Sequence, residues 1–287
     1  MVSFGRVSTA MVTPFDSKGN IDFEKTTQLV NHLINNGTDS LVVAGTTGES
    51  PTLTAEEKVA LFRHTVEAVA GRVPVIAGTG SNNTKQSIEL TKKAEEAGVD
   101  AIMLVAPYYN KPNQEGLYQH FKTIAESTSL PVMIYNIPGR ASVNITPDTT
   151  IRLSKIANIV AAKEASGNID AMTEIIAGTA DDFLVYSGDD GLTLPVLSVG
   201  GDGVVSVASH IVGNEMQQMV SCFLEGKHQE AAKIHQQLLP VIRGLFAAPS
   251  PVPVKTALQL KGMDMGSVRL PLVPLSEAER TDLMKFL

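Results

Sequence analysis

The chain has 287 residues, of which 43% are hydrophobic, and a formal net charge of −7. This length can bury a large core in one large domain or two smaller ones, and the acidic balance argues against a nucleic-acid surface or a basic patch for anionic lipids. The single cysteine, Cys222, excludes an intrachain disulfide, and the six histidines form no HxH or HExxH pattern that would favour a metal site. No apolar run approaches the ~20 residues of a membrane helix and no signal-peptide pattern opens the chain, so we expect a cytoplasmic protein.

Eight short apolar runs recur along the chain and predict buried strands. They lie at residues 7–13, 40–44, 73–77, 100–105, 131–135, 158–163, 183–187 and 203–207. The runs are apolar on both faces rather than alternating, which is typical of strands in a parallel sheet.

Segments with helix signals separate these runs. Residues 22–37, 54–71 and 84–98 each end in glycine, a common helix stop, and residues 113–128 follow the fourth run. Strand and helix alternating over about 220 residues favour an α/β fold of the (β/α)8 barrel type. A doubly wound open sheet is the alternative, but its glycine-rich phosphate loop is missing after the first strand, where the sequence reads TPFDSKG.

The pattern changes near residue 226. Residues 227–246, 253–262 and 276–287 carry helix signals without a strand between them, and PSPVP at 249–253 is a stiff connector. We therefore predict a catalytic barrel over residues 1–225 and a C-terminal helical domain over residues 226–287.

Lys163 closes the sixth predicted strand, the place where barrels of this type carry catalytic groups. The ordinary interpretation is a lysine that reaches solvent or pairs with Glu164 or Glu49. The functional interpretation is a Schiff-base lysine, because burial lowers a lysine pKa and a neutral amine can attack a carbonyl carbon. The residues alone leave both interpretations open.

Other polar groups follow neighbouring predicted strands. Tyr135 closes the fifth strand and is either a core aromatic or a proton donor and acceptor. GTTGES at 45–50 is either a plain turn or a nest of N–H donors for a small carboxylate. In IPGR at 137–140, Pro138 and Gly139 suit a type II turn, which would aim Arg140 over the barrel mouth to hold a carboxylate.

Four motifs occur in a specific order and spacing: GTTGES, PYYNKP, YNIPGR and KEASG. Together they resemble the dihydrodipicolinate synthase family, and the resemblance extends over essentially the whole chain. It implies a barrel with a C-terminal helical domain that condenses pyruvate with L-aspartate 4-semialdehyde, the first committed step toward diaminopimelate and lysine. It also implies a dimer or tetramer and no metal or organic cofactor, since the lysine itself is the electron sink.

The resemblance implies roles for individual catalytic residues. Lys163 would form the imine with pyruvate, and Tyr135 would donate and accept protons. Thr46 would link Tyr135 to Tyr109, a tyrosine that members of the family lend to the neighbouring subunit.

The resemblance implies substrate-binding residues as well. Thr47 and the backbone at Val205 would bind the carboxylate of pyruvate, and Gly188 would line the pocket. Arg140 would hold the carboxylate of the aldehyde.

Lysine-inhibited members of the family share an effector site beside GTTGES. The matching positions here are Ser50, Ala55, Lys58, Asn82, Gln86 and Tyr108. Gln86 stands in place of a glutamate that would pair with an amino-acid ammonium, and Lys58 stands in place of a histidine and has the same charge as that ammonium. We therefore predict weak or absent feedback by L-lysine.

Two kinds of alternative remain. An N-acetylneuraminate lyase or a 2-keto-3-deoxy sugar-acid aldolase would share the lysine and the tyrosine, but a polyhydroxy chain favours neutral groups where Arg140 offers a cation. A non-catalytic binding protein would have no reason to place a lysine, a tyrosine and two threonines at neighbouring strand ends.

Overall fold

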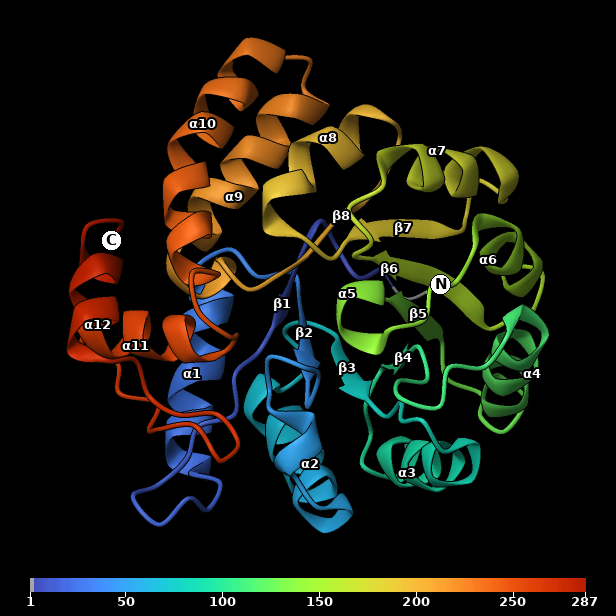
Figure 1. Cartoon of the computed structure of the whole chain (residues 1–287), viewed down its shortest axis with the longest axis horizontal. Coiled ribbons are helices and arrows are strands. Elements are labelled where there is room, and N and C mark those ends of the chain that lie inside the picture. Colours follow the sequence, from blue (N-terminus) through green and yellow to red (C-terminus); the bar gives the residue numbers. More distant parts are fainter. Residues whose placement is uncertain (1–2) are drawn as a thin grey trace.

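Eight parallel strands form a closed barrel in the computed structural model, which describes residues 3–287 (Figure 1). In chain order they are β1 (Val7–Ala10), β2 (Ser40–Val43), β3 (Val75–Gly78), β4 (Ala101–Val105), β5 (Val132–Asn136), β6 (Ile159–Glu164), β7 (Leu184–Ser187) and β8 (Gly203–Ser206). Each strand pairs with the next, and β8 pairs with β1. The predicted barrel is confirmed, and β1 ends at Ala10 rather than at residue 13.

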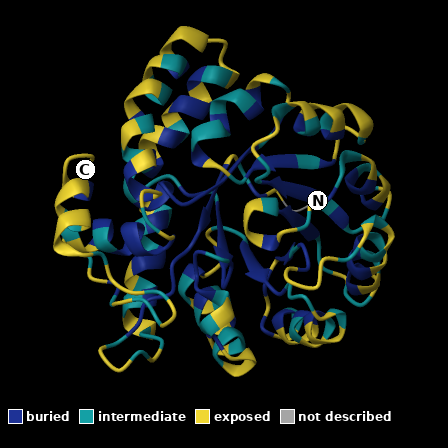
Figure 2. Cartoon of the chain, in the orientation of Figure 1, coloured by how far each residue is buried: buried dark blue, intermediate teal, exposed yellow. Residues whose placement is uncertain are grey.

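Helices surround the barrel and expose their outer faces, while the strands are buried (Figure 2). They are α1 (Phe23–Asn35), α2 (Ala55–Val69), α3 (Thr84–Glu96), α4 (Gln114–Ala125), α5 (Pro138–Ala141), α6 (Pro147–Leu153), α7 (Ile169–Gly178), α8 (Thr193–Ser198), α9 (Ser209–Leu224), α10 (His228–Leu245), α11 (Val252–Leu260) and α12 (Glu277–Met284), with 3-10 turns at Ser50–Thr52 (η1) and Asp190–Leu192 (η2). No helix in residues 3–287 is long and apolar enough to cross a membrane.

Local signals account for several helix ends. The side chain of Thr54 accepts the N–H of Glu57, and Glu57 accepts the N–H of Thr54, so α2 begins with the predicted capping box. Gly37 and Gly98 follow α1 and α3 with φ of +88° and +82°, a conformation that glycine adopts at little cost.

The predicted type II turn at residues 137–140 is wrong. Such a turn needs a positive φ at Gly139, whereas residues 138–141 form the short helix α5. The N–H groups of Arg140 and Ala141 both donate to the carbonyl of Ile137, and Pro138 supplies a φ suited to the first helical position. Arg140 is thus carried over the barrel by a helical turn.

The C-terminal helices α10, α11 and α12 lie together on one side of the barrel (Figure 1). Helix α10 packs along α9, which follows the last strand. The strand-free C-terminal region agrees with the sequence, while the division into two domains at residue 226 stays a prediction.

Three aspartates hold the strands together at the face where the strands begin. Asp39 precedes β2 and accepts the N–H of Val7 in β1 at 2.9 Å. Asp100 precedes β4 and accepts the N–H of Val75 in β3 at 2.8 Å. Asp202 makes the equivalent bond from β8 to β7, accepting the N–H of Val185. These bonds fix strand register at the end of the barrel that usually serves stability.

Asp100→Ala is expected to lower the free energy of unfolding by about 1–3 kcal/mol, because the buried N–H of Val75 loses its acceptor. Urea unfolding measures this loss. Asp100→Asn keeps an acceptor oxygen and should lose less. Equal losses in the two variants would contradict the account.

Candidate active site

Strands β5 and β6 place Tyr135 and Lys163 side by side inside the barrel. The two residues are register partners, and they follow Met133 and Ala161 of the inner core by two positions. Because side chains alternate along a strand, all four face the interior. The Nζ atom of Lys163 lies 4.0 Å from the centroid of the Tyr135 ring.

Lys163 is enclosed, since only 5% of the residue is exposed. The two carboxylates considered as its partners are engaged elsewhere: Glu49 accepts from Lys255 Nζ at 2.8 Å, and Glu164 accepts from the N–H of Ser166 at 2.7 Å. The structure therefore disagrees with the interpretation of Lys163 as a solvent-reaching lysine or as a partner of these carboxylates.

Burial lowers the pKa of Lys163 from 10.5 to about 8, and the positive charge of Arg140 adds to the lowering while Asp190 opposes it. With that pKa, about half of the amine is neutral at pH 8, compared with about 0.3% for an ordinary lysine. The site therefore supplies a nucleophilic amine under mild conditions.

The Tyr135 hydroxyl stays protonated over the same range. Burial raises its pKa to about 12, although the charge of Arg140 and hydrogen bonding with Thr46 act in the opposite direction. A protonated phenol beside an amine can donate a proton, and the phenolate that remains can accept one.

Gly188, in the loop after β7, packs against the lysine stem. A Cβ atom at this position would lie 3.0 Å from Cε of Lys163 and 2.7 Å from Cβ of Ala165. Any larger residue at position 188 would therefore press on the side chain of Lys163. Val205 of β8 is buried in the same inner core as Tyr135.

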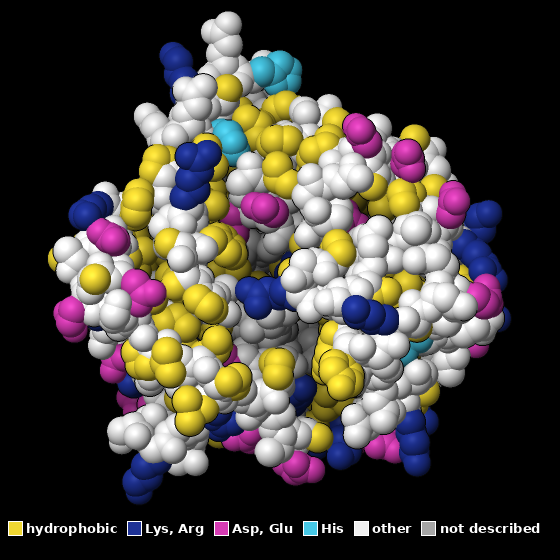
Figure 3. Space-filling view, viewed as in Figure 1, with side chains coloured by type: hydrophobic (Ala, Val, Ile, Leu, Met, Phe, Trp, Pro, Cys, Tyr) yellow, Lys and Arg dark blue, Asp and Glu magenta, His cyan; other side chains and the backbone are white. Residues whose placement is uncertain are grey.

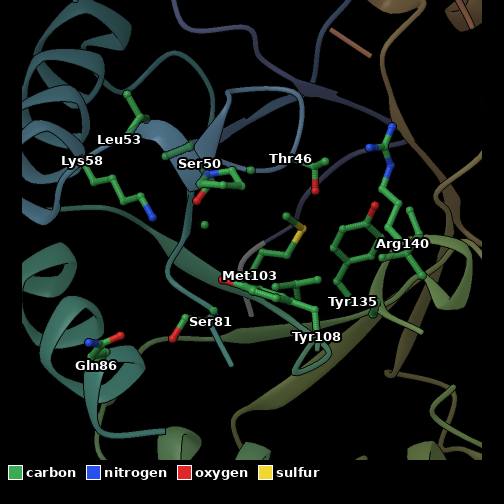
Figure 4. Close-up of a pocket in the computed structure, with 18 residues that line it drawn as sticks. Thr46, Ser50, Leu53, Lys58, Ser81, Gln86, Met103, Tyr108, Tyr135 and Arg140 are labelled. Carbon is green, nitrogen blue, oxygen red and sulfur yellow. The ribbon is translucent and has the colours of Figure 1, made fainter. Parts of the chain in front are cut away.

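A cavity of about 430 Å³ opens at the strand ends (Figure 4). Thr46, Tyr135 and Arg140 line one end, and Lys58 and Gln86 line the other. Arg140 and Lys58 are the charged residues of this lining, which holds no aspartate or glutamate within residues 3–287. Figure 3 shows basic side chains beside the hollow at the centre of this face. The cavity therefore favours anionic ligands.

Five predicted catalytic or substrate-binding residues lie outside the cavity lining: Thr47, Tyr109, Lys163, Gly188 and Val205. Lys163 lies behind Tyr135, which does line the cavity. Tyr109 is 89% exposed, with a φ of +72°, and Thr47 is buried. Among the effector positions, Ser50 and Tyr108 line the cavity with Lys58 and Gln86, whereas Ala55 and Asn82 do not.

Sequence reasoning gave no role to Asp190, which closes the SGDD stretch after β7. Its carboxylate is buried and accepts from the Ser206 hydroxyl and from the N–H groups of Val207 and Ala208. Its negative charge favours the ammonium form of Lys163. A carboxylate at a strand end was the available signal, but the sequence does not show which groups it meets.

Tyr186 is the register partner of Lys163 on β7. Its hydroxyl donates to the carbonyl of Gly5 at 2.8 Å, near the start of the chain. This bond turns the phenol away from the cavity and leaves Tyr135 as the tyrosine beside the amine. Within residues 3–287, no group of three or more His, Cys, Asp or Glu side chains could hold a metal ion.

Comparisons with known proteins agree on one family. The Dihydrodipicolinate synthetase family matches residues 3–287. A 4-hydroxy-tetrahydrodipicolinate synthase from Bacillus velezensis is 69% identical over 282 residues, which cover 98% of each chain. A crystal structure of dihydrodipicolinate synthase from Bacillus anthracis superposes with a TM-score of 0.99 at 67% identity, covering 100% of this chain and 98% of that one. A second, from Cyanidioschyzon merolae with lysine bound, has a TM-score of 0.98 at 47% identity and the same coverage.

The fold, the site and these relatives define an enzyme of the lyase class built on a (β/α)8 barrel. Within that class, the chain belongs to the dihydrodipicolinate synthetase family. The resemblance inferred from the four motifs is confirmed.

Lys163 is expected to react with a small amine-specific reagent with half-maximal rate near pH 8, because burial lowers its pKa. Competitive labelling followed by mass spectrometry of the Lys163 peptide measures this midpoint. Arg140→Gln should raise the midpoint by removing a repelling charge, and Asp190→Asn should lower it. A midpoint near 10.5 in the wild type would contradict the electrostatic account.

Proposed function

We propose that the chain condenses pyruvate with L-aspartate 4-semialdehyde to give 4-hydroxy-tetrahydrodipicolinate, the first committed step toward diaminopimelate and lysine. The observation that carries this proposal is the buried Lys163, with its lowered pKa, beside Tyr135, which lines a cavity whose charged residues are Arg140 and Lys58. A cytoplasmic setting is part of the proposal, since the one cysteine is free and buried.

The mechanism begins with attack of the neutral Lys163 amine on the keto carbon of pyruvate, which forms an imine after loss of water. Loss of a methyl proton then gives an enamine, whose carbon adds to the aldehyde. Holding the two reactants in one cavity supplies a large effective molarity. The amino group of the second substrate finally attacks the imine carbon, which closes the ring and frees Lys163.

Each of these steps moves protons, and we assign their transfer to Tyr135, which lies beside the amine. Thr46 lines the cavity beside Tyr135, and we extend the relay through Thr46 to Tyr109 of a second subunit. Two features support that extension: Tyr109 is 89% exposed, and its left-handed backbone, with a φ of +72°, costs roughly 1–2 kcal/mol in a residue other than glycine. We infer from this that the enzyme self-associates, at least as a dimer.

Both proposed substrates carry a carboxylate. Arg140 lines one end of the cavity, and we assign it to the carboxylate of the aldehyde. Thr47 and the backbone at Val205 are assigned to the carboxylate of pyruvate. A sugar-acid aldolase would present neutral hydrogen-bonding groups to a polyhydroxy chain, so Arg140 favours the semialdehyde.

Borohydride is expected to trap pyruvate on Lys163. Reduction of the imine adds the mass of pyruvate less one oxygen, which peptide mass spectrometry locates on one residue. Lys163→Ala should lose the adduct, and Lys155→Ala, at an exposed lysine, should retain it. Tyr135→Phe should slow turnover by about 10²–10⁴-fold, because it loses the acid–base group. An adduct that persists in Lys163→Ala would refute the proposal.

The identity of the aldehyde is tested by pyruvate consumption. Wild-type enzyme should consume pyruvate with L-aspartate 4-semialdehyde and not with N-acetylmannosamine or a sugar aldehyde. Arg140→Gln should raise KM for the semialdehyde far more than KM for pyruvate.

We further propose that L-lysine inhibits the enzyme weakly or not at all. At the end of the cavity lined by Lys58 and Gln86, neutral Gln86 stands where a glutamate would pair with an ammonium, and Lys58 stands in place of a histidine and repels that ammonium. No carboxylate lines that end within residues 3–287. Burial also lowers the pKa of Lys58, as expected for a cation with limited solvation.

Steady-state assays with millimolar L-lysine should therefore show little loss of rate. The double variant Lys58→His, Gln86→Glu restores a negative group and should become more sensitive. Strong inhibition of the wild type would overturn the proposal, and so would a double variant no more sensitive than wild type.

A further inference from the structure

A buried ion pair joins the loop after β2 to the C-terminal helices. Glu49 is 2% exposed and both of its carboxylate oxygens accept hydrogen bonds. Lys255 Nζ donates to Oε1 at 2.8 Å, and the N–H of Arg269 donates to Oε2 at 2.8 Å. Lys255 lies on α11 and Arg269 follows it, so both donors come from the far end of the chain.

The lysine of this pair is as enclosed as the glutamate, with 4% exposure. Its Nζ atom also donates to the carbonyl of Ser267 at 2.9 Å and lies 4.2 Å from the centroid of the Phe15 ring. Because a buried charge without its partner is costly, the pair holds its two segments in one arrangement.

Glu49 also shapes the turn that carries the two threonines. Its backbone is left-handed, with a φ of +57°, and its N–H donates to the carbonyl of Thr46 at 3.1 Å. Such a conformation persists in a residue other than glycine only when the surroundings hold it. Here the surroundings are the donors from Lys255 and Arg269.

Arg269 holds the next part of the same loop. Its guanidinium donates to the carbonyl of Thr52 at 2.8 Å and forms an ion pair with Glu57 at the start of α2. It also donates to the carbonyl of Gly19 in the loop after β1. The segment from Glu49 to Glu57 is thus fixed from outside the barrel, and Thr46, three residues before it, lines the cavity beside Tyr135.

We propose that Glu49 and Lys255 are positioning residues, through which the C-terminal helices set the place of Thr46 and Thr47 in the active site. Neither side chain touches the substrates; both act through the turn. The kinetic part of this inference rests on the proposed function, whereas the position of the turn does not.

The test compares Lys255→Met and Glu49→Gln with the double variant that carries both changes. Lys255→Met leaves a buried carboxylate without its ionic partner and is expected to lose stability. The double variant removes both charges of the pair, so neither is left buried without its partner. We therefore expect it to fold even if a single variant does not. Arg152→Met, which breaks an exposed ion pair with Glu115, is the matched control.

In the double variant, the amides of residues 45–50 should exchange with deuterium faster than in wild type. Its kcat should fall about 10- to 100-fold, the size expected when a catalytic group is displaced by about 1 Å, and its KM for pyruvate should rise. Borohydride should still trap pyruvate on Lys163, because the strands that carry the amine are untouched. The control should match wild type in all of these measurements.

A folded double variant with wild-type kcat and KM would overturn the inference, whatever its melting temperature, because a purely structural pair would change stability alone. Failure of the proposed function looks different: the wild type itself would then give no pyruvate adduct. Faster exchange at residues 45–50 would still show that the pair fixes the turn.

Discussion

The desolvation of one amine is the constraint on which the rest of this site depends. The inner face of the barrel offers Lys163 apolar neighbours, and the resulting cost of an ammonium lowers its pKa to about 8. The negative charge of Asp190 limits that lowering and the positive charge of Arg140 extends it, so the pKa of the amine depends on both residues. Gly188 keeps the space that the lysine stem occupies. The chemistry is therefore set by the barrel interior as much as by the lysine itself.

The sequence was sufficient for the strands and for the main pair of the site. Continuous apolar runs mark strands that are buried on both faces, and strands consecutive in a barrel are neighbours. That rule alone puts Tyr135 beside Lys163. The turn predicted at Pro138 and Gly139 is wrong. There, helical hydrogen bonds to the carbonyl of Ile137 override the local preference of a Pro-Gly pair for a turn.

Pairings between distant residues could not be predicted in the same way. Glu49 was considered as a partner for Lys163, yet it pairs with Lys255 on α11. Asp190 likewise meets Ser206 and the N–H groups that follow it. No local pattern encodes which buried charges meet, because tertiary packing decides it. These unpredicted contacts determine how the active-site loops are held.

Strand register and the cavity depend on opposite ends of the barrel. Asp39, Asp100 and Asp202 bind strand N–H groups at the end opposite the cavity. Substitutions around Arg140 can consequently change the cavity while every one of those bonds persists. A barrel organised in this way can evolve a different substrate preference while its strand register stays the same.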